Sequence, residues 1–265
     1  MANAFPQTIV DGPARVAAPY GLFSVLAFRE PLDKHWEGAG VTWQSLDGSK
    51  NLGVFGAVQT DPDNNLGSPK TFERVVTIET AGVFTLYGQQ KITPMTWTQE
   101  AASARARDLL LGLEERAVER VLGGVVSGLP LNFADATPFT SSQLHSEVIA
   151  ELEGFIAENY GSRGVIHMSR LDASNALSAR VLETRGNGLS TRLGTPVAAG
   201  SGYAEGVAYC SSSLLAHRSD VFDSSGQPYD NLDKETNDLY AIAERTYSIG
   251  YEALALGAVT ITPLA

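Results

Sequence analysis

The stretch from Thr96 to Gly124 limits what this chain can fold into, because it has the pattern of one unbroken amphipathic helix. Thr96 is a favourable N-cap, and Gln99 follows three residues later, as a capping box requires. Gly123 and Gly124 end the pattern. At about 1.5 Å per residue, such a helix is roughly 40 Å long. The stretch therefore predicts either a long surface helix packed on one sheet or the spine of an elongated, flat subunit.

The predicted helix has an apolar face and a charged remainder. Its apolar residues recur at steps of three and four, which places them on one side: Ala102, Ala106, Leu110, Leu113, Ala117 and Val121. The charged residues fill the rest of the surface: Arg105, Arg107, Asp108, Glu115, Arg116 and Glu119. Within this set, Arg116 and Glu119 are spaced for an ion pair on the helix surface.

Composition narrows the classes of function. A chain of 265 residues, with 43% hydrophobic and 18% charged residues, can form one large domain or two smaller ones around a real core. The net charge of −11 argues against a nucleic-acid reader, because phosphate binding requires clustered lysine and arginine. The single cysteine, Cys210, excludes a disulfide framework and multi-cysteine metal sites, and its strand-like neighbours indicate a buried thiol.

The N-terminal residues form a proline-containing arm, and the sequence has no targeting or membrane-spanning segment. Residues 1–21 contain Pro6, Pro13 and Pro19 and no helical periodicity, so this arm is either disordered or laid along another surface. It lacks the basic and apolar regions of a signal peptide. No segment reaches 18 uninterrupted apolar residues, so we expect no membrane span and a protein made and kept in the cytosol.

The first half of the chain reads as strands around a long excursion. Short apolar runs predict strands at 21–28, 41–44 and 54–58. Residues 30–75 are rich in turn formers and predict an extended, twisted hairpin that packs on a neighbouring molecule. Residues 72–90 predict two strands that meet at Ala81 and Gly82.

The second half mixes helices and strands. We expect a loop over 128–138, a helix over 142–160, a buried strand over 164–168 and a helix over 171–182 with Asp172 near its positive end. The apolar stripe of the first of these helices is Leu144, Val148, Ile149, Leu152 and Ile156. Strands and turns follow residue 186, a polar loop covers 224–236, and strands fill 238–261. The pattern is α+β, with helices and strands in runs.

No motif in the sequence nominates catalytic chemistry. Gly200-Ser201-Gly202 is not a nucleophile elbow, and 186–188 lacks what dinucleotide binding requires. Residues 61–72 fail as a calcium loop, because Leu66 replaces the sharp-turn glycine and Phe72 the final glutamate. The histidines are dispersed: His35, His145, His167 and His217. His167 is read as a satisfied core histidine. The sequence thus predicts a protein that is not an enzyme, with no catalytic, cofactor or metal residues.

Four segments in order resemble a known family. ARARDLLLGLEERAVERVLGG (104–124), GVIHMS (164–169), LGTPVAAGSGY (193–203) and NDLYAIAERTY (237–247) are similar to segments of major capsid proteins of tailed phages that infect actinobacteria. Those proteins have the Hong Kong 97-type capsid fold. The resemblance covers roughly residues 95–260 and, more loosely, 36–87.

The resemblance implies an organisation and a function. Residues 1–21 would be an N-terminal arm, 22–92 an extended loop with flanking peripheral-domain strands, and 93–125 the spine helix. Residues 126–235 would form the axial domain, and 236–265 the C-terminal peripheral strands. The implied function is a major head protein that assembles as hexamers and pentamers into an icosahedral shell. That shell would enclose double-stranded DNA in the virion without sequence-specific binding, after assembly in the host cytoplasm.

The resemblance also bears on whether subunits are crosslinked and on which partner proteins are expected. Some relatives join subunits through a lysine–asparagine isopeptide bond, and the loop contains Lys50, Lys70, Asn51, Asn64 and Asn65. No partner or acid can be placed beside them, so we predict no crosslink. Because no long helical region precedes the arm, we expect a separate scaffolding protein. A portal and decoration proteins are further expected partners.

Two alternatives stay open at the level of sequence. An encapsulin-type bacterial compartment shell would share the fold, although its usual N-terminal cargo-binding helix is replaced here by a proline-rich arm. A soluble α+β enzyme would be a compact monomer or dimer.

Overall fold

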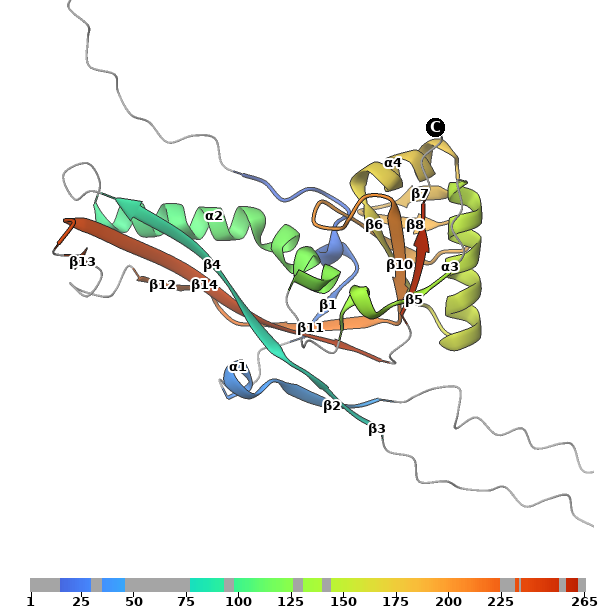
Figure 1. The fold of residues 1–265 in the computed structure, drawn as a ribbon, viewed down its shortest axis with the longest axis horizontal. Helices are drawn as coiled ribbons and strands as arrows, with labels where there is room; N and C mark the ends of the chain where they lie inside the picture. The colour runs from blue at the N-terminus through green and yellow to red at the C-terminus, as the bar shows by residue number, and fades with distance from the viewer. Residues whose placement is uncertain are drawn as a thin grey trace, which may run out of the picture. The chain divides into compact units, whose positions relative to one another are not determined.

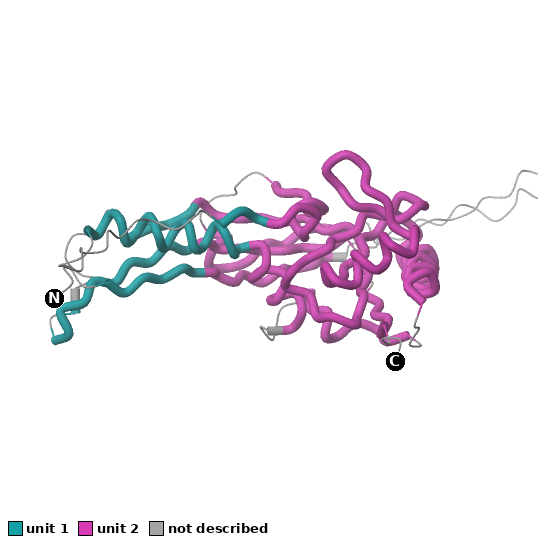
Figure 2. Tube along the Cα trace, turned by 90° about the horizontal axis from the view of Figure 1, so that it is seen from above, with its two compact units in different colours: residues 1–17, 87–114, 221–244 teal, residues 18–86, 115–220, 245–265 magenta. Residues whose placement is uncertain are grey.

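The structure of the chain is a computed structural model. It describes residues 15–29, 35–45, 77–92, 98–125, 131–139, 144–224, 232–233, 235–252 and 256–261. The chain forms two compact units (Figure 2). Unit 1 comprises residues 1–17, 87–114 and 221–244, and unit 2 comprises residues 18–86, 115–220 and 245–265. Among the described residues, no helix is long and apolar enough to cross a membrane.

The first core of unit 2 lies between a mixed sheet and two helices (Figure 1). The strand order is β5 (Thr137–Pro138), β15 (Gly257–Thr260), β10 (Val207–Ser211), β6 (Val165–Ser169), β9 (Pro196–Gly200), β8 (Gly188–Thr191) and β7 (Leu182–Arg185). Helices α3 (His145–Asn159) and α4 (Arg170–Ser178) pack on it. Strand β6 is buried along its whole length, including its polar residues His167 and Ser169, as a central strand covered on both faces should be.

A second sheet is organised around the long strand β14 (Asp238–Tyr251). Its order is β1 (Ala27–Phe28), β11 (Leu214–Arg218), β14 and β12 (Phe222–Asp223), and both β4 (Val83–Ile92) and β13 (Leu232–Asp233) also pair with β14. Over its unit 2 part lies the second core, which includes Leu22, Val118, Phe133 and Tyr247. The 3-10 helices η1 (Leu22–Ser24) and η3 (Phe133–Asp135) supply two of these side chains.

The long helix α2 spans Gln99–Arg120 and continues into the turn Val121–Val125. Gly124 in that turn has φ 96°, so the predicted glycine stop is confirmed. In unit 1 the helix lies close to its neighbouring strands because the contacting residues are small. Ala106 is fully buried, and a side chain at Gly88 of β4 would collide with the Ala106 carbonyl oxygen.

A two-stranded ribbon, β2 (Val41–Ser45) with β3 (Thr77–Ala81), follows the short helix α1 (Trp36–Ala39) in unit 2. The strands are antiparallel, with Ser45 opposite Thr77. The indole N–H of Trp43 donates to the carbonyl oxygen of Tyr251 at 2.8 Å, which fixes the ribbon to β14. The predicted strands at 41–44 and on both sides of Ala81-Gly82 are thus confirmed. The predicted strand 54–58, the calcium-loop residues and the crosslinking candidates lie outside the described residues.

Several predicted boundaries need correction. Residues 21–28 form η1 and a two-residue strand instead of one strand, because backbone N–H groups of η1 bond to side-chain carboxylates of α2. The helix predicted over 171–182 is α4, which ends at Ser178 and is followed by Arg180 at φ 60°. The loop predicted over 128–138 contains η3 and β5.

The ends and the buried face of the predicted helices also shift. Helix α2 begins at Gln99 with the Thr98 hydroxyl accepting from the N–H of Ala101 at 3.2 Å, whereas Thr96 lies outside the described part. Helix α3 begins at His145, and Leu144 of the predicted stripe is 52% exposed. The other four members of that stripe are buried, as predicted.

Candidate functional site: the carboxylate clasp of the N-terminal segment

Two glutamates of α2 hold the segment that follows the N-terminal arm. One Glu119 oxygen accepts the backbone N–H of Leu22 at 3.0 Å, and the other accepts that of Gly202 at 2.8 Å. Glu115 accepts the N–H of Phe23 at 2.7 Å. The clasp therefore joins α2, η1 and the turn after β9 within unit 2, and it takes up backbone donors that no strand partner satisfies.

The environment of Glu119 is unusual for a carboxylate. Its side chain is only 1% exposed, and burial raises its pKa from the ordinary value of 4.5, although the N–H groups of Leu22, Gly202 and Ser201 act in the opposite direction. A Cβ at Gly202 would lie 2.6 Å from that of Glu119, so this position needs glycine. The glycine-rich turn 200–202 thus packs closely against the buried carboxylate of Glu119.

The segment before η1 is also laid on the protein. Arg170 donates to the carbonyl oxygen of Pro19 at 2.6 Å, and the N–H of Ala199 donates to that of Tyr20 at 2.6 Å. In unit 1, a Cβ at Gly112 would lie 2.7 Å from the Cβ of Arg15. Of the two open expectations for the arm, docking is the correct one for residues 15–21, while residues 1–14 lie outside the described part.

His167 lies in a closed network of the core. Its Nδ1 lies 3.0 Å from the Tyr203 hydroxyl and its Nε2 lies 2.8 Å from the Ser211 hydroxyl. The centroid of the Phe133 ring lies 4.7 Å from that of the imidazole. Burial lowers the pKa of His167 to about 3, so the imidazole is neutral. The prediction of a satisfied core histidine is confirmed.

Asp172 is a second buried acid with a structural role. Its carboxylate accepts the Ser169 hydroxyl at 2.6 Å and the N–H of Gly206 at 3.0 Å. Ser169 in turn caps α4, as its hydroxyl accepts the N–H of Asp172 at 3.1 Å. The predicted place of Asp172 near the start of this helix is confirmed. The Nε2 atom of His145 lies 4.0 Å from an oxygen of the Asp172 carboxylate.

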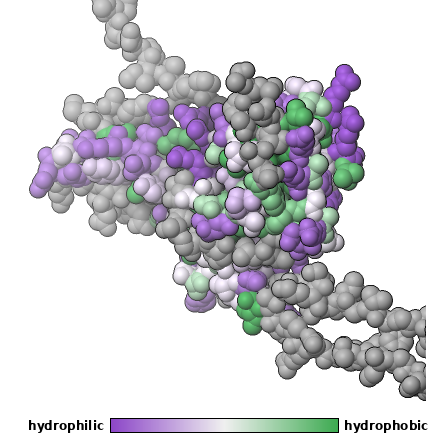
Figure 3. Space-filling model, turned by 45° about the vertical axis from the view of Figure 1, so that its right-hand side comes forward, coloured by the Kyte–Doolittle hydropathy of each residue, from purple (hydrophilic) through white to green (hydrophobic). Residues whose placement is uncertain are grey.

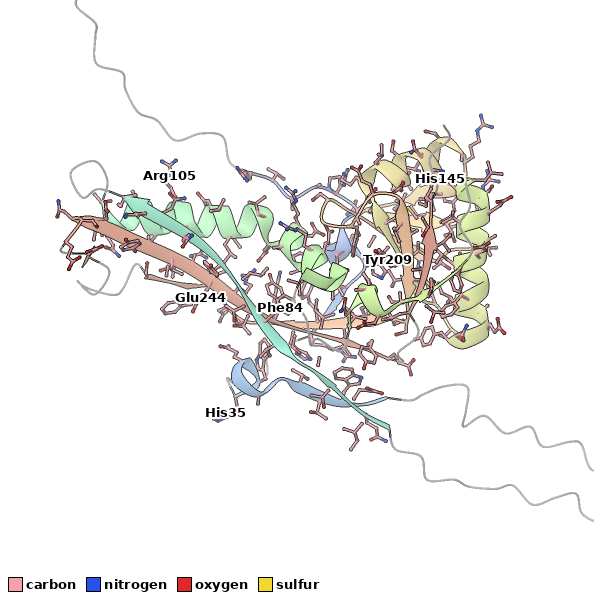
Figure 4. All side chains as sticks on the ribbon, in the orientation of Figure 1. His35, Phe84, Arg105, His145, Tyr209 and Glu244 are labelled. Atoms are coloured by element: carbon pink, nitrogen blue, oxygen red, sulfur yellow. The ribbon has the colours of Figure 1, made fainter. Side chains whose placement is uncertain are left out.

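The remaining candidate groups do not assemble into a reactive centre. In Figure 4, His35 and His145 lie on separate elements, before α1 and at the start of α3. Cys210 is fully buried, and burial raises the pKa of its thiol to about 12, so the predicted buried thiol is confirmed. Within the described ranges, no three histidine, cysteine, aspartate or glutamate residues are grouped to hold a metal ion.

Sequence reasoning missed the clasp because it placed Glu119 on the polar face, paired with Arg116. The buried face of α2 instead runs at steps of four: Ala102, Ala106, Leu110, Glu114, Val118 and Leu122. Leu113 and Ala117 of the predicted face are half-buried. The clasp residues Glu115 and Glu119 are not members of this series, so the spacing of buried residues along the helix gives no signal for them.

Comparison with solved structures identifies the fold. A chain from Microbacterium phage Oxtober96 matches with a TM-score of 0.63 and 11% identity, over 99% of this chain and 96% of that one. A chain from the Phage G gp27 major capsid and gp26 decoration proteins matches with a TM-score of 0.54 and 11% identity, over 96% and 94%. The capsid of an empty GTA particle matches with a TM-score of 0.59 and 10% identity, over 98% and 95%.

The chain therefore has the fold of viral capsid subunits. More closely, it is the Hong Kong 97-type fold of tailed-phage major capsid proteins, with the long helix and the α+β pattern that the sequence predicts. No protein-family model matches the sequence, and no curated protein matches it.

Proposed function

We propose that this chain is a major capsid protein that assembles as hexamers and pentamers into an icosahedral head around double-stranded DNA. The observation that carries the proposal is the extent of the fold match. The capsid of the empty GTA particle aligns over nearly the full length of both chains, with no large part of either left over. The net charge of −11 suits a wall that confines DNA without gripping it.

The proposal assigns a role to each part of the chain. Helix α2 with β4 and β14 would form the peripheral domain, and residues 126–235 the axial domain. Residues 1–21 would be the arm, and the loop between β2 and β3 would lie over the next subunit. The role is structural, with no catalytic or cofactor site, and a separate scaffolding protein, a portal and decoration proteins would be its partners.

Assembly of the purified chain tests the proposal. The full chain, produced with its scaffolding partner where one is required, is separated by size-exclusion chromatography and imaged by negative-stain electron microscopy. We expect closed shells or five- and six-membered rings, and DNA inside native particles. A compact monomer or dimer under all conditions would overturn the proposal, and shells filled with protein cargo would indicate a compartment instead.

A further inference from the structure

Unit 2 contains an apolar groove that its own described side chains leave open. The groove has a volume of about 520 Å³ and lies between α3 and the ends of β7 and β8. Its apolar walls are formed by Ile149, Ala150, Gly154, Ala157, Val181 and Leu193. Leu193 is 83% exposed, and Figure 3 shows hydrophobic residues among polar ones where the α3 side comes forward. Exposed apolar surface rimmed by polar residues is typical of an interaction site.

The walls of the groove are fixed before anything binds. Glu153 of α3 accepts the hydroxyl of Thr191 at 2.5 Å and that of Thr195 at 2.8 Å. These bonds tie the helix to both ends of the turn that carries Arg192 and Leu193. A preformed surface loses little conformational entropy on binding, so modest contacts at this site yield more net affinity.

The charges beside the groove are separated by sign. Exposed glutamates Glu147 and Glu158 lie on α3, at the two ends of the row of small residues. Three exposed arginines lie on the other side of the groove. They follow α4, end β7 and follow β8, respectively: Arg180, Arg185 and Arg192. Arg185 is partly neutralised by Glu183, which leaves Arg180 and Arg192 to face a partner. One copy of the unit thus offers both an acidic helix and a basic edge.

We propose that a second copy of this chain covers the groove in a head-to-tail contact. In this contact, the acidic face of α3 in one copy meets the arginine edge of the next. A contact between two different surfaces of the same chain repeats around a ring when the rotation closes. The row of small residues, Ala150, Gly154 and Ala157, allows the neighbour to approach closely, and Leu193 adds apolar contact. This inference rests on the proposed function and names the surface that would join subunits within a ring.

Complementary charge reversal tests the contact. The first variant carries Glu147→Arg and Glu158→Arg, the second carries Arg180→Glu and Arg192→Glu, and the full chains are scored for rings and shells by chromatography and electron microscopy. We expect each variant alone to lose assembly by at least about tenfold, since like charges then face each other. An equimolar mixture of the two variants opposes opposite charges at every contact when the variants alternate, so it should recover six-membered rings, whereas a five-membered ring keeps one like-charge contact. The quadruple variant, which restores opposite signs at every contact, should recover most assembly.

The matched control reverses exposed acids elsewhere in unit 2, with Glu205→Arg and Asp220→Arg, and has the same change in net charge. It should assemble as the wild type does. Normal assembly of either charge variant, or no recovery in the quadruple variant, would overturn the contact. If the wild type itself forms neither rings nor shells, the proposed function fails first, so the two failures are distinguishable.

Filling the groove provides an independent measurement. A Cβ at Gly154 meets no atom within 4 Å, so Gly154→Trp should fold with an unchanged circular dichroism spectrum while its ring occupies the groove. Ser174→Trp, at an exposed position on α4, is the control. We expect loss of assembly for Gly154→Trp alone. Assembly of this variant at the wild-type level would show that another protein, or nothing, covers the groove.

Discussion

At the scale of single residues, Glu119 best illustrates how this fold depends on one buried acid. A carboxylate with backbone donors on both oxygens is compatible with burial, because each N–H it satisfies would otherwise be unpaired. The same burial raises its pKa, so its ionised form carries a desolvation penalty in the native state.

Glu119→Gln should therefore destabilise the subunit, and the difference should depend on pH. The amide places a donor against one backbone N–H, which we expect to lower the free energy of unfolding by about 1–3 kcal/mol near neutral pH. As the pH falls through the raised pKa towards 4.5, the native glutamate takes up a proton before the unfolded one does, so the wild type gains stability and the variant does not.

Urea unfolding of the unassembled chains at several pH values measures the gap, which is the unfolding free energy of the wild type minus that of Glu119→Gln. Glu158→Gln, a neutralisation on the exposed face of α3, is the control and should leave stability almost unchanged. A gap that shrinks on acidification would contradict the assignment of the raised pKa to Glu119.

His167 should affect stability with the opposite sign. Its native pKa is about 3, whereas an unfolded imidazole titrates near about 6.5. Between these values the unfolded chain binds a proton that the native chain does not. The contribution of His167 to stability is therefore lost as the pH falls through this range.

His167→Asn removes this proton uptake. The slope of unfolding free energy against pH, measured between pH 4 and 6, should decrease by up to about 1.4 kcal/mol per pH unit relative to the wild type. The variant should also be less stable at pH 7, because the Tyr203 and Ser211 hydroxyls lose a partner. Parallel slopes in the two proteins would show that His167 is not the buried neutral base described here.

At the scale of elements, the long helix also contacts Arg15, the first described residue of the N-terminal arm. Gly112 allows Arg15 to lie against the helix surface. Gly112→Ala improves helix propensity by up to about 1 kcal/mol, yet its Cβ would push against Arg15. Global stability and arm docking should thus change in opposite directions.

Limited trypsin digestion at Arg15 measures arm release in Gly112→Ala. We expect cleavage several-fold faster than in the wild type, with thermal unfolding unchanged or slightly later. Gly123→Ala is the matched control, because a Cβ there meets no atom within 4 Å. Equal cleavage rates in all three proteins would mean that the arm does not depend on this glycine.

The elements also show how far sequence reasoning reaches. The end of α2, the stripe of α3 and the strand β6 were predictable, because glycine stops and regular apolar spacing are local signals. Residues 21–28 were wrongly predicted as one strand, because the partners of Leu22 and Phe23 are carboxylates 97 and 92 positions away. Such a partner leaves no periodicity in the segment it binds, so the clasp could not be read from local pattern.

At the scale of the whole molecule, the fold is recognisable although identity to the compared capsid structures is only 10–11%. Layer architecture depends on which positions are apolar and where turns occur, and many sequences satisfy that pattern. The proposed function depends on contacts with other copies, which the sequence pattern of one chain encodes only weakly.

Replacement of the segment between β2 and β3 tests the proposed contact of that loop with the next subunit. Ser45 and Thr77 are opposite each other in the ribbon, so an Asn-Gly turn can join them in place of residues 46–76. We expect a folded subunit with a thermal midpoint close to that of the wild type and with no closed shells in electron micrographs.

Two observations decide the outcome of that replacement. Preserved near-ultraviolet circular dichroism would show that the Trp43 contact with Tyr251 survives. Closed shells of normal size from the shortened chain would exclude a necessary role for this segment in assembly.

The carboxylate of Glu119 also sets an order of events during synthesis. Its two backbone donors lie 97 residues upstream and 83 residues downstream. In a nascent chain that has not yet emerged beyond Gly202, one oxygen of Glu119 therefore lacks its backbone donor. We therefore expect the segment at Leu22 to reach its final docked form only after residue 202 has left the ribosome.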